Sequence, residues 1–171
     1  MGLFSSDYEI KMFQPFVRLF FDHIGENPYE LFSLLYGYEA FPYPPLMLGI
    51  ESIGLAMSLL ASEHWFLSHL LFKLPLLFFD YMGLWYLMRL YPRRQKYIGI
   101  LYFASPIILY STYMHGQLDV IPTTLFLGAI YYLLQKGRFS TIKFAVMVTL
   151  ALLTKFHILA AVPLLFIFLE K

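Results

Sequence analysis

The chain has 171 residues, of which 60% are hydrophobic, 20% aromatic and only 13% charged. Soluble domains are about half apolar and about a quarter charged, so the composition argues against a soluble fold and favours lipid as the main solvent. A formal net charge of +1 argues against nucleic acid as a partner, and the absence of cysteine excludes disulfides, thiol catalysis and Cys-based metal sites.

The first 63 residues are predicted to form an extracytoplasmic loop with helices that lie along the membrane. Residues 3–21 and 29–38 are aromatic and partly amphipathic, and Asn27-Pro28 between them is typical of a break. Residues 41–45 contain three prolines, which predict a rigid, non-helical turn.

Residues 46–61 are apolar but short for a membrane span, and Glu51 interrupts them. We expect an interfacial or re-entrant helix whose Glu51 and Ser52 lie toward water. A helix that crosses the membrane is the alternative.

Four later stretches approach or exceed the ~20 apolar residues that a membrane span needs, and they are predicted to be transmembrane helices. They cover residues 65–88, 97–114, 120–135 and 142–169. The connections at residues 89–96 and 136–138 are basic, and short basic loops stay in the cytoplasm. The connection around residues 115–119 and the first 63 residues then face outward. Those 63 residues hold eight acidic but only two basic residues, as expected of an extracytoplasmic segment.

The sequence thus predicts an all-α integral membrane fold, with one membrane domain over residues 1–171. Its parts are the extracytoplasmic loop with interfacial helices, residues 1–63, and the four transmembrane helices in residues 65–169.

Ionisable residues within the predicted spans are candidate functional residues, because a charge near mid-bilayer costs a few kcal/mol. Lys73 and Asp80 are two helical turns apart and share a face, which favours either a structural pair or a functional one. Lys155 and His157 lie in the outward half of the last span. The Lys155 ammonium can bind a lipid phosphate there, or it can snorkel or pair between helices.

The third span has sixteen residues, which reach only ~24 Å of a ~30 Å hydrocarbon core. The turn before it must then dip toward the bilayer, and this places His115, Gln117 and Asp119 at the edge of a membrane-level cavity. Helix capping is an alternative role for Asp119 alone.

Asp7 and Glu9 place two carboxylates two residues apart in the outward-facing segment. Such a pair can bind a divalent cation, Mg²⁺ or Mn²⁺, through oxygen ligands, or supply a general base and a group that tunes it. Acidic pairs are also common on solvated surfaces, so the pattern by itself does not distinguish these roles.

Taken together, these residues resemble the GT-C glycosyltransferases, most closely the prokaryotic mannosyltransferase-like members related to the second mannosyltransferase of glycosylphosphatidylinositol-anchor synthesis. The matching elements occur in family order over nearly all 171 residues. They are Asp7 with Glu9, Asn27-Pro28-Tyr29, Tyr43-Pro-Pro-Leu46, Lys73-Leu-Pro75 with Asp80, Ser105-Pro106, Gly116-Gln-Leu-Asp119, and Leu153-Thr-Lys155 with Pro163.

The resemblance implies an enzyme of the prokaryotic plasma membrane that moves a hexose, mannose by preference, from a polyprenyl- or dolichyl-phosphate donor to an acceptor hydroxyl on the extracytoplasmic face, with inversion. It implies Asp7 as the general base and Glu9 as its partner or a metal ligand. The substrate-binding residues that we expect are His115, Gln117, Asp119, Lys155 and His157, with Lys155 at the donor phosphate.

Family members usually carry a spanning helix before the acidic pair and several more after the region of Lys155. The resemblance therefore implies an N-terminal part of such an enzyme, with the remainder of a split enzyme as a partner beside the donor and membrane lipid. Two other functions stay open. One is an ion- or proton-coupled transporter segment whose path uses Lys73, Asp80, Lys155 and His157, and the other is a noncatalytic membrane subunit.

Overall fold

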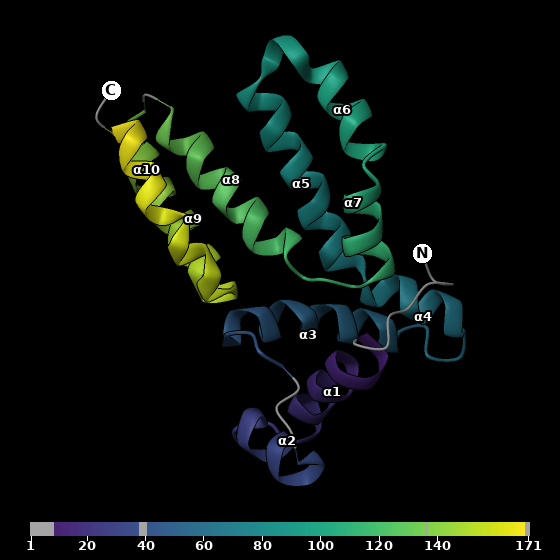
Figure 1. Cartoon of the computed structure of the whole chain (residues 1–171). Coiled ribbons are helices and arrows are strands. Elements are labelled where there is room, and N and C mark those ends of the chain that lie inside the picture. Colours follow the sequence, from purple (N-terminus) through teal and green to yellow (C-terminus); the bar gives the residue numbers. More distant parts are fainter. Residues whose placement is uncertain (1–8, 38–40, 136, 170–171) are drawn as a thin grey trace. The chain divides into compact units, whose positions relative to one another are not determined.

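The computed structural model describes residues 9–37, 41–135 and 137–169, and within these ranges the regular elements are all helices (Figure 1). This confirms the predicted all-α class. In chain order they are η1 (Glu9–Phe13), α1 (Gln14–Asp22), α2 (Pro28–Tyr36), α3 (Pro45–Leu59), α4 (Trp65–Phe72), α5 (Leu74–Leu90), η2 (Pro92–Arg94), α6 (Gln95–Phe103), α7 (Pro106–Ile108), η3 (Leu109–Met114), α8 (Val120–Leu133), α9 (Ser140–Thr154), η4 (Phe156–Ala160) and α10 (Val162–Leu169).

The helices group into two compact units. Unit 1 comprises Met1–Pro75 and Tyr110–Gln117, and unit 2 comprises Leu76–Leu109 and Leu118–Lys171. One membrane domain over residues 1–171 stays a prediction.

An aromatic cluster forms the core of unit 1 where α1 and α2 meet. The ring of Phe16, only 1% exposed, stacks on Phe41 at 4.8 Å and contacts Phe32 at 5.3 Å. The Asn27 side chain accepts a hydrogen bond from the backbone N–H of Tyr29 at 3.2 Å and so caps α2. The predicted break at Asn27-Pro28 between two helical stretches is therefore confirmed.

Helix α3 follows the predicted proline turn: Pro44 is extended, and Pro45 is the first helical residue, a position that favours proline. It packs against α4 through Gly54: a Cβ at this position would lie 2.4 Å from the backbone carbonyl oxygen of Phe72. This contact requires a glycine, because the obstacle is backbone and cannot rotate away.

We expect Gly54→Ala to lower the free energy of unfolding by about 1–3 kcal/mol, because the added methyl group must push α3 and α4 apart. Gly49→Ala in the same helix is the matched control, since nothing lies within 4 Å of its Cβ position. That control should be stabilising by about 0.5–1 kcal/mol through helix propensity. Thermal melting of the two variants measures the difference, and equal melting temperatures would contradict the close packing at Gly54.

Unit 2 is built from two helical hairpins, α5 with α6 and α8 with α9 (Figure 1). Thr124 on α8 donates a hydrogen bond to the carbonyl oxygen of Phe79 on α5 at 2.8 Å, and it occupies the space beside Gly83. Further along the same two helices, Gly128 lies against the ring of Tyr86. Small residues on each helix thus allow α5 and α8 to approach closely.

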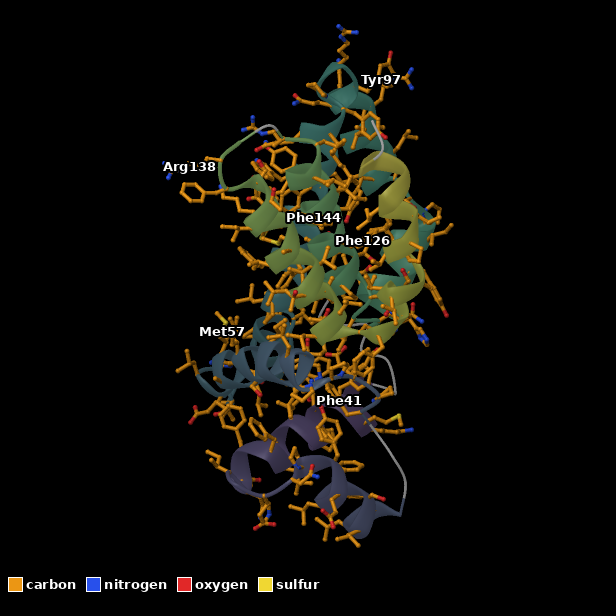
Figure 2. All side chains as sticks on the ribbon, turned by 90° about the vertical axis from the view of Figure 1, so that its left-hand side faces the viewer. Phe41, Met57, Tyr97, Phe126, Arg138 and Phe144 are labelled. Carbon is orange, nitrogen blue, oxygen red and sulfur yellow. The ribbon has the colours of Figure 1, made fainter. Side chains whose placement is uncertain are left out.

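Both basic turns lie at the same end of unit 2. Figure 1 shows the α5–α6 and α8–α9 connections at one end, and Figure 2 shows Tyr97 and Arg138 toward that end, beyond Phe126 and Phe144. The start of α8 and the end of α9 lie at the other end, because the two helices form an antiparallel hairpin. The prediction that both basic connections lie on the same side of the membrane is therefore compatible with the geometry of unit 2.

The last predicted span is not one helix. Helix α9 ends at Thr154, Lys155 is extended with φ −162°, and α10 runs back toward the end that holds the α8–α9 connection (Figure 1). Pro163 is the second residue of α10. A proline is tolerated there, because the N–H groups of the first helical turn have no partner within the helix. The hydropathy of residues 142–169 concealed this reversal, because both helices are apolar.

Within the part of the chain that the structure describes, no single helix combines the length and the hydropathy that crossing a membrane requires. Two pairs of consecutive helices meet both requirements when taken together: Trp65–Phe72 with Leu74–Leu90, and Pro92–Phe103 with Pro106–Met114. The breaks within these pairs fall at Lys73 and at residues 104–105. Unit 2 also exposes many large apolar side chains, among them Phe78, Leu101, Ile107, Ile142 and Leu159.

Candidate functional site

The candidate site consists of an ion pair between Asp119 and Lys155, at the end of unit 2 opposite the basic turns. The Lys155 ammonium contacts the Asp119 carboxylate and donates a hydrogen bond to it. Asp119 precedes α8 and Lys155 follows α9, so the α8–α9 hairpin brings together two residues that are 36 positions apart. The extended backbone of Lys155 ends α9 and carries its side chain to this position.

The Asp119 carboxylate does not cap α8, because no side-chain capping hydrogen bond is made there. Its backbone carbonyl instead accepts hydrogen bonds from the hydroxyl of Thr123 at 2.7 Å and from the backbone N–H of the same residue at 3.2 Å. This leaves the carboxylate to pair with Lys155. The capping alternative for Asp119 is therefore wrong.

Both charged groups are accessible, with side-chain exposures of 42% for Asp119 and 28% for Lys155. An accessible ammonium can bind a phosphate oxyanion, and the adjacent carboxylate can accept hydrogen bonds from sugar hydroxyls. The pair has the chemistry that the predicted donor, a sugar phosphate, requires. His157 lies two residues after Lys155, in η4, and is exposed.

The other two residues of the predicted substrate cluster belong to unit 1. The His115 ring stacks on the Tyr110 ring at 5.9 Å, and the backbone N–H of Gln117 donates to the carbonyl oxygen of Ser111 at 2.9 Å. The structure therefore brings Asp119 and Lys155 together, and it places His115 and Gln117 with the other unit.

The predicted acidic pair has a different outcome. Asp7 lies outside the described residues. Glu9 is 3% exposed and forms an ion pair with the equally buried Lys73 at 2.9 Å, where η1 meets the end of α4. Glu9 is therefore buried and paired with a cation instead of lying on an outward-facing solvated segment, and its role as the partner of Asp7 or as a metal ligand stays a prediction. Within the described ranges, no group of three or more Asp, Glu, His or Cys residues could hold a metal ion.

Lys73 and Asp80 each have a partner within their own unit. Lys73 pairs with Glu9 in unit 1, and Asp80, in unit 2, accepts a hydrogen bond from the hydroxyl of Tyr102 on α6. A break in the helix at Lys73 separates the two residues, so the periodicity of one continuous helix does not apply to them.

Glu51 was expected to lie toward water, and this prediction is wrong because only 3% of the residue is exposed. Burial and the nearby charge of Glu9 raise the pKa of the Glu51 carboxyl to about 8, above its ordinary 4.5. Two glutamates and a lysine thus share the interior of unit 1. Sequence reasoning missed this cluster, and its only signal was that Glu51 and Lys73 each interrupt an otherwise apolar stretch.

Comparisons of the chain with protein families, with characterised proteins and with solved structures found no match. A functional proposal must therefore depend on the chain's own residues.

Proposed function

We propose that this chain is a membrane-embedded part of a glycosyltransferase of the GT-C type, which moves a hexose from a polyprenyl-phosphate donor to an acceptor hydroxyl on the extracytoplasmic face. The observation that carries the proposal is the accessible pair of Asp119 and Lys155, at the end of unit 2 opposite both basic turns. The ordered set of family-like motifs along the chain gives further support.

The composition and the exposed side chains support a membrane location. Large apolar residues are exposed on α5, α6 and α9 and on the segments that follow α6 and α9. A surface in contact with water would carry charged residues at such positions. Short basic turns remain on the cytoplasmic side during insertion, so the turns near Arg93 and Arg138 orient unit 2. The Asp119–Lys155 pair then lies at the extracytoplasmic end.

Each residue of the pair has a distinct role in this proposal. The Lys155 ammonium leaves Asp119 to bind the phosphate of the lipid-linked donor, and this releases the carboxylate to accept hydrogen bonds from the sugar. Asp7 acts as the general base that removes the proton from the acceptor hydroxyl. The hexose, mannose in the first instance, is then transferred with inversion, and the lipid phosphate is the leaving group.

We expect Lys155→Met to lower sugar transfer by roughly 10- to 100-fold at subsaturating donor, because a charge-assisted contact contributes about 1.5–3 kcal/mol. The assay uses membranes of the source cell that carry the wild-type or variant gene, with radiolabelled polyprenyl-phosphate mannose and polyprenyl-phosphate glucose offered separately. Label that moves from donor lipid to acceptor is counted. The loss should fall mainly on KM for the donor.

Lys143→Met is the matched control, because Lys143 lies at the opposite end of α9 with its ammonium 5.2 Å from the ring centre of Tyr132. It should transfer sugar at the wild-type rate. Asp7→Asn should reduce kcat with little change in KM, which separates base catalysis from phosphate binding. Transfer that survives deletion of the gene, or equal rates in Lys155→Met and Lys143→Met, would rule the proposed function out.

A further inference from the structure

A second site lies at the other end of unit 2, where the turn between α5 and α6 forms an open pocket of about 750 Å³. It is separate from the Asp119–Lys155 pair. Its lining residues are Tyr91, Arg93, Arg94, Tyr97, Ile98 and Leu101.

The turn that holds the two arginines is well defined. The backbone N–H of Arg94 donates to the carbonyl oxygen of Tyr91 at 2.9 Å, and Pro92 restricts the backbone between them. The side-chain amide of Gln95 donates to the carbonyl oxygen of Met88 at 3.3 Å, which ties the start of α6 to the end of α5. The pocket is therefore formed by a fixed turn and by the first turns of a helix.

Arg93 and Arg94 are exposed, and among the described residues no carboxylate pairs with either of them. Other arginines of unit 2 lie over aromatic rings, Arg89 at 5.1 Å from the ring centre of Trp85 and Arg138 at 5.7 Å from that of Phe139. Two neighbouring guanidinium groups that no carboxylate neutralises can bind a phosphate diester through paired hydrogen bonds.

The rest of the pocket is apolar and aromatic. Leu101 and Tyr97 are each 70% exposed, and Ile98 lies between them on the same helix. A soluble phosphate ester would leave these side chains in water, whereas a phospholipid would cover them with its acyl chain. Tyrosines beside arginines also match the headgroup level of a bilayer.

We propose that this pocket binds an anionic phospholipid, with the phosphate at Arg93 and Arg94 and an acyl chain along Ile98 and Leu101. The inference rests on the membrane location in the proposed function and is independent of sugar transfer. Basic pockets on the cytoplasmic side of membrane proteins recognise anionic headgroups by the same chemistry. The lipid would fix the α5–α6 turn at the inner membrane surface.

The test is native mass spectrometry of the full chain with phosphatidylglycerol or phosphatidylcholine, which counts the lipid that each variant retains. Wild type should retain phosphatidylglycerol preferentially. The double variant Arg93→Gln/Arg94→Gln should lose affinity for it by roughly 30-fold, since each basic residue near an anionic surface contributes about fivefold. Arg93→Lys/Arg94→Lys, which keeps the charge but not the paired geometry, should fall between the two.

The matched control is Arg138→Gln/Lys143→Gln, which removes two positive charges near the other basic turn and should change affinity less than threefold. An equal loss in this control would overturn the inference, because binding would then follow charge alone. Glycerol phosphate that displaces the lipid at equal concentration would also overturn it and would identify a soluble ester as the ligand. Flotation separates the two proposals. Failure to float on either neutral or anionic vesicles refutes the membrane location and with it the lipid site, whereas flotation together with equal retention of phosphatidylglycerol and phosphatidylcholine refutes only the lipid site.

Discussion

Lys73→Met should be among the most destabilising single substitutions in unit 1, with a loss of about 3–5 kcal/mol in the free energy of unfolding. The Lys73 ammonium lies 2.9 Å from the Glu9 carboxylate, and both side chains are nearly inaccessible to water. Methionine keeps the volume of the side chain but removes the cation, so a buried carboxylate loses the partner that neutralises it. Thermal and denaturant melting of the purified chain in detergent measure the loss.

Two further variants separate the ion pair from the size of the side chain. Lys96→Met removes an exposed lysine of unit 2 and should change stability by less than about 0.5 kcal/mol. Adding Glu9→Gln to Lys73→Met should restore at least about 1 kcal/mol, because the amide carries no charge to bury. If Lys73→Met melted at the same temperature as Lys96→Met, the buried pair would not hold unit 1 together.

The local features of the fold could be predicted from the sequence because they depend on short-range chemistry. The break at Asn27-Pro28 follows from a capping side chain and a missing N–H, and the proline turn before α3 follows from restricted backbone angles. The reversal after Thr154 is made instead by the extended Lys155 and the short segment η4 (Phe156–Ala160), which lie between two apolar helices. Hydropathy does not distinguish that arrangement from a single long helix.

The partners of the charged residues could be predicted only in part, because each pair joins distant positions. The spacing of one continuous helix puts Lys73 on the same face as Asp80, whereas its ion pair with Glu9 joins it to another element of unit 1. Sidedness placed Asp119 and Lys155 at the same end, and this is what the structure shows for unit 2. Their direct contact depends on the α8–α9 hairpin, which periodicity alone does not specify.

Glu51→Gln should make the stability of the chain much less dependent on pH. In the folded chain, burial and the charge of Glu9 raise the pKa of the Glu51 carboxyl to about 8. In the unfolded chain the group loses its proton near its ordinary pKa of 4.5. The folded state therefore holds one more proton between these values, and the stability that Glu51 contributes decreases as pH rises from about 4.5 to about 8.

Glutamine resembles the protonated side chain, so the variant should match wild type near pH 5 and exceed its stability near pH 8. The gain of the variant over wild type should grow by about 3–4 kcal/mol between these pH values, since one pKa unit corresponds to 1.36 kcal/mol and Glu51 is half ionised at pH 8. Melting curves at both pH values measure it. Glu63→Gln is the matched control, because it removes an exposed acid beyond the end of α3. Its stability should differ from that of wild type by the same small amount at both pH values. A pH-independent difference between Glu51→Gln and wild type would mean that Glu51 is ionised throughout, and the interior of unit 1 would then need a cation beyond Lys73 to balance two carboxylates.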